Sequence, residues 1–121
     1  MNLYRCSICG NVISLLSGDA DHITCCGEKM QKLKANTVDA SHEKHVPACT
    51  VKDDQIFVQV GETIHPMLEE HYIEWIALVK DDKIIRVNLK PGEEPKAVFP
   101  YEENAEIYEY CNLHGLWKTS I

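Results

Sequence analysis

Four of the six cysteines of this 121-residue chain lie within its first 26 residues. Cys6 and Cys9 form a C-x-x-C knuckle before a glycine, and the adjacent pair Cys25 and Cys26 precedes another glycine. A segment this short cannot bury enough apolar surface to fold by itself, so a metal held by four thiolates would supply the missing stability. The spacing therefore predicts a small metal module over residues 1–36.

Two other readings of these cysteines are a disulfide-bonded knot and a set of idle thiols. The N-terminus carries no apolar signal segment, which predicts a reducing, cytoplasmic location and disfavours disulfides. The regular spacing disfavours idle thiols. Tetrahedral four-sulfur sites accept iron or zinc, and the residues leave that choice open. Adjacent cysteines are nevertheless unusual for a zinc ribbon, which generally repeats the C-x-x-C knuckle.

The remainder of the chain reads as β structure. Residues 37–44 lack a period and are expected to form a linker or exposed loop, and the β pattern begins at Val46. The expected strands are short and separated by turn signals, among them Asp81-Asp82 and Pro91-Gly92; they cover 55–60, 72–80, 83–88, 96–99 and 105–110. We therefore predict an all-β protein, in which residues 37–121 form an immunoglobulin-like antiparallel β-sandwich after the cysteine module.

Within this β region, one helical turn is expected at 67–70. Ile73, Trp75, Phe57 and Val58 are expected to be ordinary core residues. In the cysteine module, the apolar pairs 12–13 and 15–16 suit short strands.

Charge and hydropathy exclude several classes of protein. Twelve basic and nineteen acidic residues give a net charge of −7, so the basic footprint of a nucleic-acid-binding protein is absent. No run approaches the ~18 apolar residues that a membrane span needs. The hydrophobic content of 45% is enough for one core.

A second metal site is indicated by histidines. His114 follows Cys111 in a C-x-x-H pattern, and His45 and His65 lie near or beside prolines that stiffen the backbone. With His71, these residues offer four imidazoles and one thiolate, which suit iron better than magnesium or calcium. His22 and His42 are expected at the surface.

The motifs resemble a known family. Cys6, Cys9, Cys25 and Cys26 resemble the four-cysteine iron module of desulforedoxin. The segments EKHVP, HPM, HYIEW, LKPG and YCNLHG resemble the superoxide reductase domain. Together they resemble desulfoferrodoxin, the two-iron class of superoxide reductase, over nearly the whole chain.

The resemblance implies two iron ions. One is tetrahedral, on the four N-terminal cysteines. The other is square-pyramidal, with His45, His65, His71 and His114 in the equatorial plane and Cys111 as the axial ligand. The position opposite the thiolate is then open for superoxide, with Glu43 and Lys44 lining it. Cys49 matches no ligand of the family and is expected to be a small, at least partly buried, hydrophobe.

The expected function is one-electron reduction of superoxide to hydrogen peroxide. An external donor such as rubredoxin would re-reduce the site, and the resemblance implies a homodimer. Long-range repulsion from the net negative charge is screened beyond ~8 Å at physiological salt, so local charge at Lys44 governs encounter. The thiolate would push electron density onto the iron, tuned by hydrogen bonds from the backbone amides of Leu113 and His114. Two alternatives are a two-centre electron-transfer protein without a substrate site and a structural metal-binding or sensing module.

Overall fold

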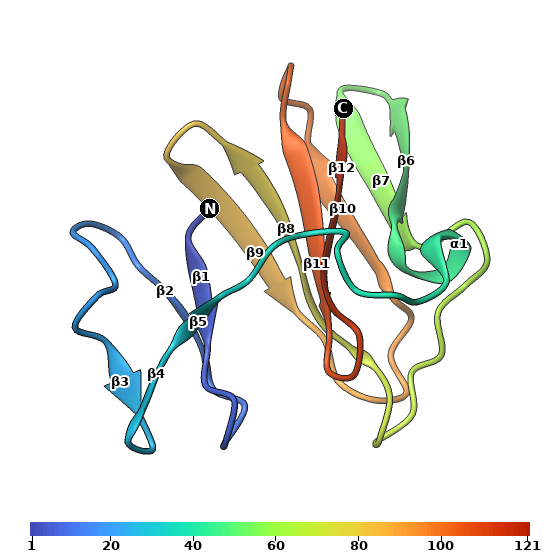
Figure 1. The fold of residues 1–121 in the computed structure, drawn as a ribbon. Helices are drawn as coiled ribbons and strands as arrows, with labels where there is room; N and C mark the ends of the chain where they lie inside the picture. The colour runs from blue at the N-terminus through green and yellow to red at the C-terminus, as the bar shows by residue number, and fades with distance from the viewer. The chain divides into compact units, whose positions relative to one another are not determined.

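The computed structural model describes residues 1–121 and divides into two compact units, Met1–Lys34 and Ala35–Ile121. Both units are built from antiparallel strands (Figure 1). The one helix, α1, spans only His42–His45, so no helix in the structure is long enough to cross a membrane. The predicted all-β class is confirmed.

The first unit has very short strands. They are β1 (Leu3–Arg5), β2 (Val12–Ser14), β3 (Thr24–Cys25), β4 (Glu28–Lys29) and β5 (Gln31–Lys32). They form one sheet in the order β2-β1-β5 and a separate β3-β4 hairpin. Its buried apolar residues are Leu3, Cys6 and Met30, whereas Leu16, expected in a strand, lies beyond β2 and is 90% exposed. So small a core agrees with a module that needs a further source of stability.

The second unit is a sandwich of two antiparallel sheets. Its strands are β6 (Pro47–Lys52), β7 (Gln55–Val60), β8 (Ile73–Lys80), β9 (Lys83–Asn88), β10 (Lys96–Pro100), β11 (Glu106–Cys111) and β12 (Gly115–Ser120). One sheet has the order β10-β7-β6 and the other the order β12-β11-β8-β9. The five predicted strands match five of these within one or two residues, but β6 and β12 were not among the predicted strands.

Two aspartate pairs make the tight turns of this unit. Asp53 and Asp54, with φ of 54° and 60°, join β6 to β7. A two-residue loop with positive φ at both central positions matches the right-handed twist of the flanking strands, and aspartate tolerates this conformation. The loop Asp81-Asp82 joins β8 to β9 in the register Lys80 to Lys83, which confirms the predicted hairpin.

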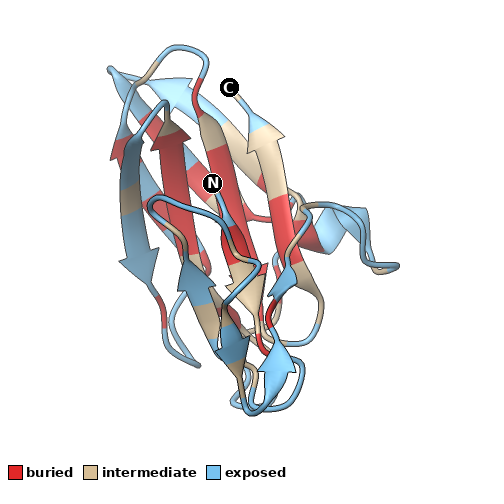
Figure 2. Ribbon diagram, turned by 60° about the vertical axis from the view of Figure 1, so that its left-hand side comes forward, coloured by how far each residue is buried: buried red, intermediate tan, exposed pale blue.

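Burial follows the central strands of the four-stranded sheet (Figure 2). In β11 every residue after the first is buried, and β8 is buried from Ile76 to Val79. Ile73 and Val58 are core residues as expected. Trp75 is only half-buried, and its ring stacks on that of Tyr110, with 5.9 Å between the centroids.

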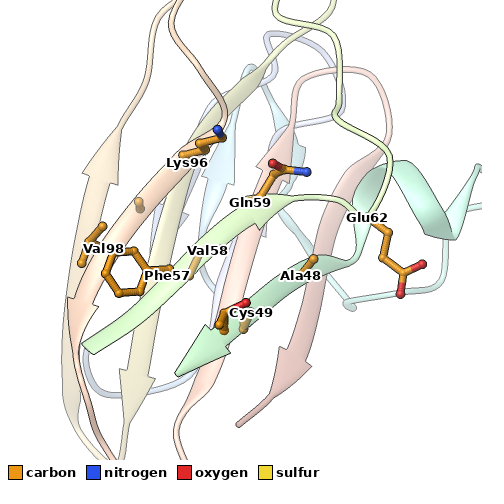
Figure 3. Close-up of a pocket in the computed structure, with 10 residues that line it drawn as sticks. Ala48, Cys49, Phe57, Val58, Gln59, Glu62, Lys96 and Val98 are labelled. Atoms are coloured by element: carbon orange, nitrogen blue, oxygen red, sulfur yellow. The ribbon is translucent and has the colours of Figure 1, made fainter. Parts of the chain in front are cut away.

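Phe57 is not a core residue, and that prediction is wrong. The two-residue period of a strand sends Ile56, Val58 and Val60 inward, so Phe57 points outward and remains 40% exposed. Figure 3 shows it on β7 beside Val98 of β10, its cross-strand partner. These two apolar side chains lie on the outer face of the three-stranded sheet.

The helical turn expected at 67–70 is absent, which makes that prediction wrong as well. The helical turn of this unit instead lies at the end of the expected linker, where α1 carries His42, Glu43, Lys44 and His45. Val46 closes it, its N–H donating to the carbonyl of His42 at 2.8 Å. This turn places a candidate ligand immediately before β6.

Candidate metal centres

The four N-terminal cysteines converge as predicted. Their sulfurs all lie within 4.8 Å of one another, with Cys9 Sγ and Cys25 Sγ 3.6 Å apart. This separation is far longer than the ~2.05 Å of a disulfide bond, and all six cysteines are free. The Cys6 knuckle closes through the N–H of Gly10, which donates to the carbonyl of Cys6 at 3.0 Å with a φ of +79°.

The ionisation of these thiols is unequal. Hydrogen bonds from the backbone amides of Cys9 and Ile8 lower the pKa of Cys6 to about 6. Hydrogen bonding with the thiols of Cys9 and Cys6 raises the pKa of Cys25 to about 12, because a second thiolate beside the first is unfavourable. Four sulfurs that cannot all ionise alone, held at tetrahedral spacing, fit a metal cation that would stabilise four thiolates.

The second constellation gathers residues from three separate parts of the second unit. His45 comes from α1, and His65 and His71 from the connection between β7 and β8. Cys111 ends β11, and His114 lies in the turn between β11 and β12. One donor atom from each lies within 4.8 Å of all the others. The five distant residues singled out in the sequence therefore meet at one point.

The four imidazole rings form a closed cycle. Neighbouring centroids are 4.6 to 5.0 Å apart, with the rings nearly perpendicular: His45–His65, His65–His71, His71–His114 and His114–His45. His45 and His71 lie across the cycle at 6.4 Å, with an interplanar angle of 29°. The four rings thus surround one point.

Backbone carbonyls fix two of the imidazole tautomers. His45 Nδ1 lies 2.7 Å from the carbonyl oxygen of Ser41, and His65 Nδ1 lies 2.7 Å from that of Pro66. Because a carbonyl only accepts hydrogen bonds, both Nδ1 atoms carry the proton and both Nε2 atoms present a lone pair.

These lone pairs face one another. His45 Nε2 lies 3.1 Å from His65 Nε2 and 3.0 Å from His114 Nδ1, and His71 Nε2 is buried without a hydrogen-bond partner. Two unprotonated nitrogens cannot hydrogen-bond each other. A cation at their centre satisfies all of them at once, so the residues fit a bound metal.

Burial favours the neutral form of three of these imidazoles. It lowers the pKa of His45, His65 and His71, and that of His65 falls to about 4. The nearby positive charge of Lys44 lowers the pKa of His45 and His71 further. A neutral imidazole is the form that binds a metal.

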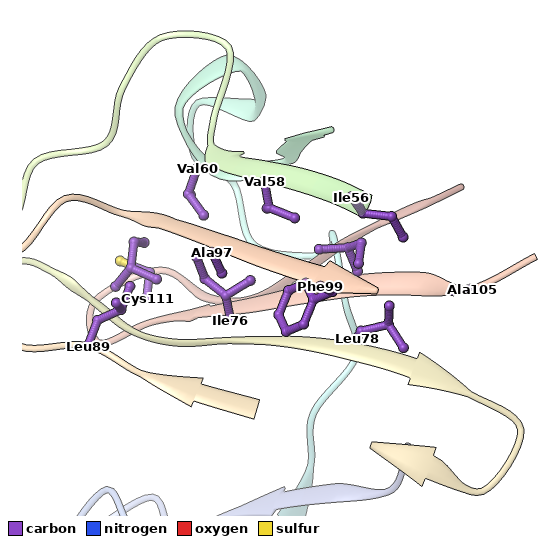
Figure 4. Packing of buried hydrophobic residues seen from close by; sticks show 12 residues of the cluster. Ile56, Val58, Val60, Ile76, Leu78, Leu89, Ala97, Phe99, Ala105 and Cys111 are labelled. Carbon is purple, nitrogen blue, oxygen red and sulfur yellow. The ribbon is translucent and has the colours of Figure 1, made fainter. Parts of the chain in front are cut away.

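Cys111 lies on the buried side of the site. It is fully buried and belongs to the apolar core cluster, where Figure 4 shows it near Leu89 and Ala97. Its Sγ lies 3.6 Å from His65 Nε2 and 4.0 Å from His114 Nδ1. Burial raises its pKa, and hydrogen bonds from the backbone amides of His114 and Leu113 oppose that rise.

The opposite side of the site opens into a hollow of about 360 Å³. All four imidazoles line it, together with Lys44, and Cys111 does not. The hollow therefore borders the imidazole rings, whereas the sulfur of Cys111 is buried in the core. Of the two residues expected to line the open position, Lys44 borders this hollow.

Glu43 lies elsewhere. It lines a neighbouring hollow of about 550 Å³ with His42, Glu62 and Cys49, apart from the four imidazoles. His22 and His42 are exposed, as expected, and Cys49 is half-buried against the core cluster, where burial raises its pKa to about 11.

Two residues near the site were not singled out in the sequence. Trp117 is fully buried, stacks on the ring of His45 at 5.0 Å and donates from Nε1 to the carbonyl of His114 at 3.0 Å. Asn112 accepts from the N–H of Tyr72 and donates to the carbonyl of Glu70, which ties the His71 segment to the Cys111 turn. The sequence signal for both was proximity to the C-x-x-H motif, since Asn112 lies within it and Trp117 lies three residues after it.

An antiparallel β protein with a four-thiolate site and a separate four-imidazole, one-thiolate site is a two-centre metalloprotein of the non-haem type. The family profile described as desulfoferrodoxin matches residues 37–120, and that of the desulfoferrodoxin N-terminal domain matches residues 1–33. The chain belongs to the desulfoferrodoxin family.

Individual relatives agree. A desulfoferrodoxin of Syntrophotalea carbinolica is 46% identical over 120 residues, covering 98% of this chain and 95% of its own. One from Nitratidesulfovibrio vulgaris is 43% identical over 118 residues, with coverages of 97% and 94%. The crystal structure of the superoxide reductase from Treponema pallidum superposes with a TM-score of 0.75 at 30% identity, covering 98% of this chain and 97% of that one.

Proposed function

We propose that this protein is a superoxide reductase, an enzyme that converts superoxide to hydrogen peroxide. The reaction takes one electron and two protons for each superoxide consumed. The observation that carries this proposal is the convergence of four imidazoles and one buried thiolate beneath a hollow open to solvent. The similarity to a solved superoxide reductase over nearly the whole chain supports it.

The proposed ligands of the catalytic iron are His45, His65, His71, Cys111 and His114. Iron bound there supplies the electron by cycling between its ferrous and ferric states. Cys111 would hold this iron with a thiolate and donate electron density to it, and the apolar core around the sulfur excludes water from it. The hollow admits a small anion and the water that delivers its protons.

Lys44 is proposed to attract the substrate. Its ammonium lines the hollow of a chain whose net charge is −7, so it supplies local attraction where the overall field repels. Glu43 is proposed to assist release of the product. For its carboxylate to reach the imidazoles, it must turn out of the neighbouring hollow that it lines.

The two units are proposed to divide the work. Residues 1–36 would hold an auxiliary iron on Cys6, Cys9, Cys25 and Cys26, and residues 37–121 would carry out catalysis. An external one-electron donor such as rubredoxin would re-reduce the catalytic iron. We further propose that the protein acts in the cytoplasm as a homodimer.

A pulse of superoxide tests the reaction. With reductant present, the iron-loaded protein is expected to yield one hydrogen peroxide for each superoxide and no oxygen. A superoxide dismutase would instead release oxygen and yield half as much peroxide. Superoxide decay at the spontaneous rate would contradict the proposal and favour a pure electron carrier.

A further inference from the structure

Gly61 stands where the loop after β7 meets the turn that carries Lys44 and His45. A Cβ on Gly61 would lie 2.6 Å from the carbonyl oxygen of Glu43, 2.9 Å from the carbonyl carbon of Lys44 and 2.9 Å from the carbonyl oxygen of Val46. All three neighbours are backbone atoms, so no change of rotamer relieves the contact. The φ of Gly61 lies outside the left-handed region, so what this position requires of glycine is space.

Hydrogen bonds join the same loop and turn. The N–H of Thr63 donates to the carbonyl of Glu43 at 3.0 Å, and the N–H of His65 donates to the carbonyl of Val60 at 2.8 Å. Gln59 Nε2 donates to the carbonyl of Gly61 at 2.9 Å. The loop is thus a closed unit that ends in one imidazole of the site and packs on the turn that bears another.

We infer that Gly61 is a positioning residue for the four-histidine site: its bare Cα lets the turn 43–46 seat against the loop 60–65, and this contact sets the approach of His45 to His65. The two Nε2 atoms lie 3.1 Å apart where these two backbone segments meet. A side chain at Gly61 separates them and moves Lys44 with its turn. The inference rests on the proposed metal site and not on its reaction with superoxide.

Cobalt(II) titration of the metal-free full chain tests this inference without any turnover, because each site gives its own visible bands. In Gly61→Ala we expect Co²⁺ affinity at the four-histidine site to fall about 10- to 100-fold, the usual effect of disturbing the support of metal ligands. The four-cysteine site serves as an internal control and is expected to keep its affinity. Unchanged affinity at the four-histidine site would overturn the inference.

Asn104→Ala is the matched control. Asn104 is exposed, has a φ of +58° and lies just before β11, at the end of that strand away from Cys111, so alanine there strains the backbone far from the ligands. We expect its Co²⁺ affinity to stay within about twofold of the wild type at both sites. An equal loss in Asn104→Ala would show that general destabilisation is sufficient, and would overturn the role of Gly61.

If Gly61→Ala does not fold, Gln59→Ala decides. It removes the hydrogen bond to the Gly61 carbonyl and introduces no clash. We expect Co²⁺ affinity at the four-histidine site to fall about fivefold, in line with loss of one neutral hydrogen bond. Wild-type affinity in this variant would overturn the inference. A wild-type protein that binds Co²⁺ but leaves superoxide untouched would refute the proposed function alone.

Discussion

Lys44 is the residue whose role depends most on the surrounding charge. It lines the same hollow as the four imidazoles, in a chain with a net charge of −7. Its neighbour Glu43 faces the adjacent hollow, so the two side chains of one short turn serve different surfaces. Removing the ammonium should leave the site intact and change only how fast an anion arrives.

Lys44→Ala is therefore expected to slow the second-order reaction with superoxide about tenfold at low salt and to flatten its salt dependence. Lys52→Ala is the matched control, because it removes an exposed charge at the far end of β6. It should leave the rate constant and its salt dependence nearly unchanged. Stopped-flow rates from 10 mM to 500 mM salt, roughly spanning Debye lengths from 30 to a few Å, measure this. Equal rates for Lys44→Ala and wild type at low salt would contradict steering.

The role of Cys111 as a ligand can be tested by replacing it with serine, with the same replacement at Cys49 as the control. Cys111→Ser should abolish the thiolate-to-iron charge-transfer band of the oxidised catalytic site and most of the activity. Cys49→Ser, at a half-buried position outside both clusters, should retain both. Visible spectra of the two iron-loaded variants decide the matter, and a surviving band in Cys111→Ser would remove this sulfur from the ligand set.

Residue types and spacing were enough to anticipate which side chains meet. A C-x-x-H and histidines near prolines, read with the family motifs, selected the five residues that the structure brings together. Trp117 and Asn112 were not predicted to support the site. Trp117 acts by stacking on His45 and Asn112 by a hydrogen bond across the fold, and local sequence encodes neither contact. The position of Glu43 in a separate hollow was not predicted either, because the sequence does not say that adjacent residues of this turn face different directions.

At the scale of the element, β11 carries a carboxyl group into the core. Glu109 lies on the strand face that also bears Ile107 and Cys111, is fully buried, and has neither carboxylate oxygen hydrogen-bonded. Its cross-strand partners are Ile76 and Trp117, which offer it no acidic or basic group. Burial raises its pKa well above the ordinary value, so the folded protein keeps this group protonated.

The raised pKa of Glu109 makes the stability of the protein depend on pH. The unfolded chain releases this proton above about pH 4.3, whereas the folded protein retains it, so stability is lost as pH rises towards the folded pKa. Glu109→Met should therefore raise the free energy of unfolding by about 1 to 3 kcal/mol near neutral pH, and by more at pH 8 than at pH 5. Urea unfolding of the metal-free protein measures it, with exposed Glu103→Met as the control. A destabilised Glu109→Met would contradict this account.

Strand periodicity explains which elements were predictable. Alternation and aspartate turns gave the β8–β9 hairpin and most other strands to within one or two residues. Strand β12 was not predicted, because it begins directly after His114 and its first residues were interpreted as part of the metal-binding motif. Phe57 was misplaced because hydrophobicity alone does not say which face of a strand a residue occupies.

The whole molecule consists of two compact units, each with its own cluster of candidate ligands. The first unit has a small core and depends on its proposed metal, whereas the second has an extensive apolar core. Loss of one metal should therefore leave the other unit folded.

Cys9→Ser tests this independence. It should strip the N-terminal iron and its red colour, yet leave superoxide consumption by the second unit largely intact. Iron analysis, visible spectra and the superoxide pulse on the same preparation provide the measurement. Complete inactivation with the second iron still present would show that the N-terminal site is obligatory for turnover.

The carbonyls of Ser41 and Pro66 orient His45 and His65. Every amino acid brings a carbonyl, so the aim of these two rings does not depend on which side chains stand at positions 41 and 66. Substitutions at these two positions, which line the hollow, can then reshape its rim while the rings keep their orientation. Because the backbone orients the rings, mutations that alter surface side chains at these positions need not alter the centre of the site.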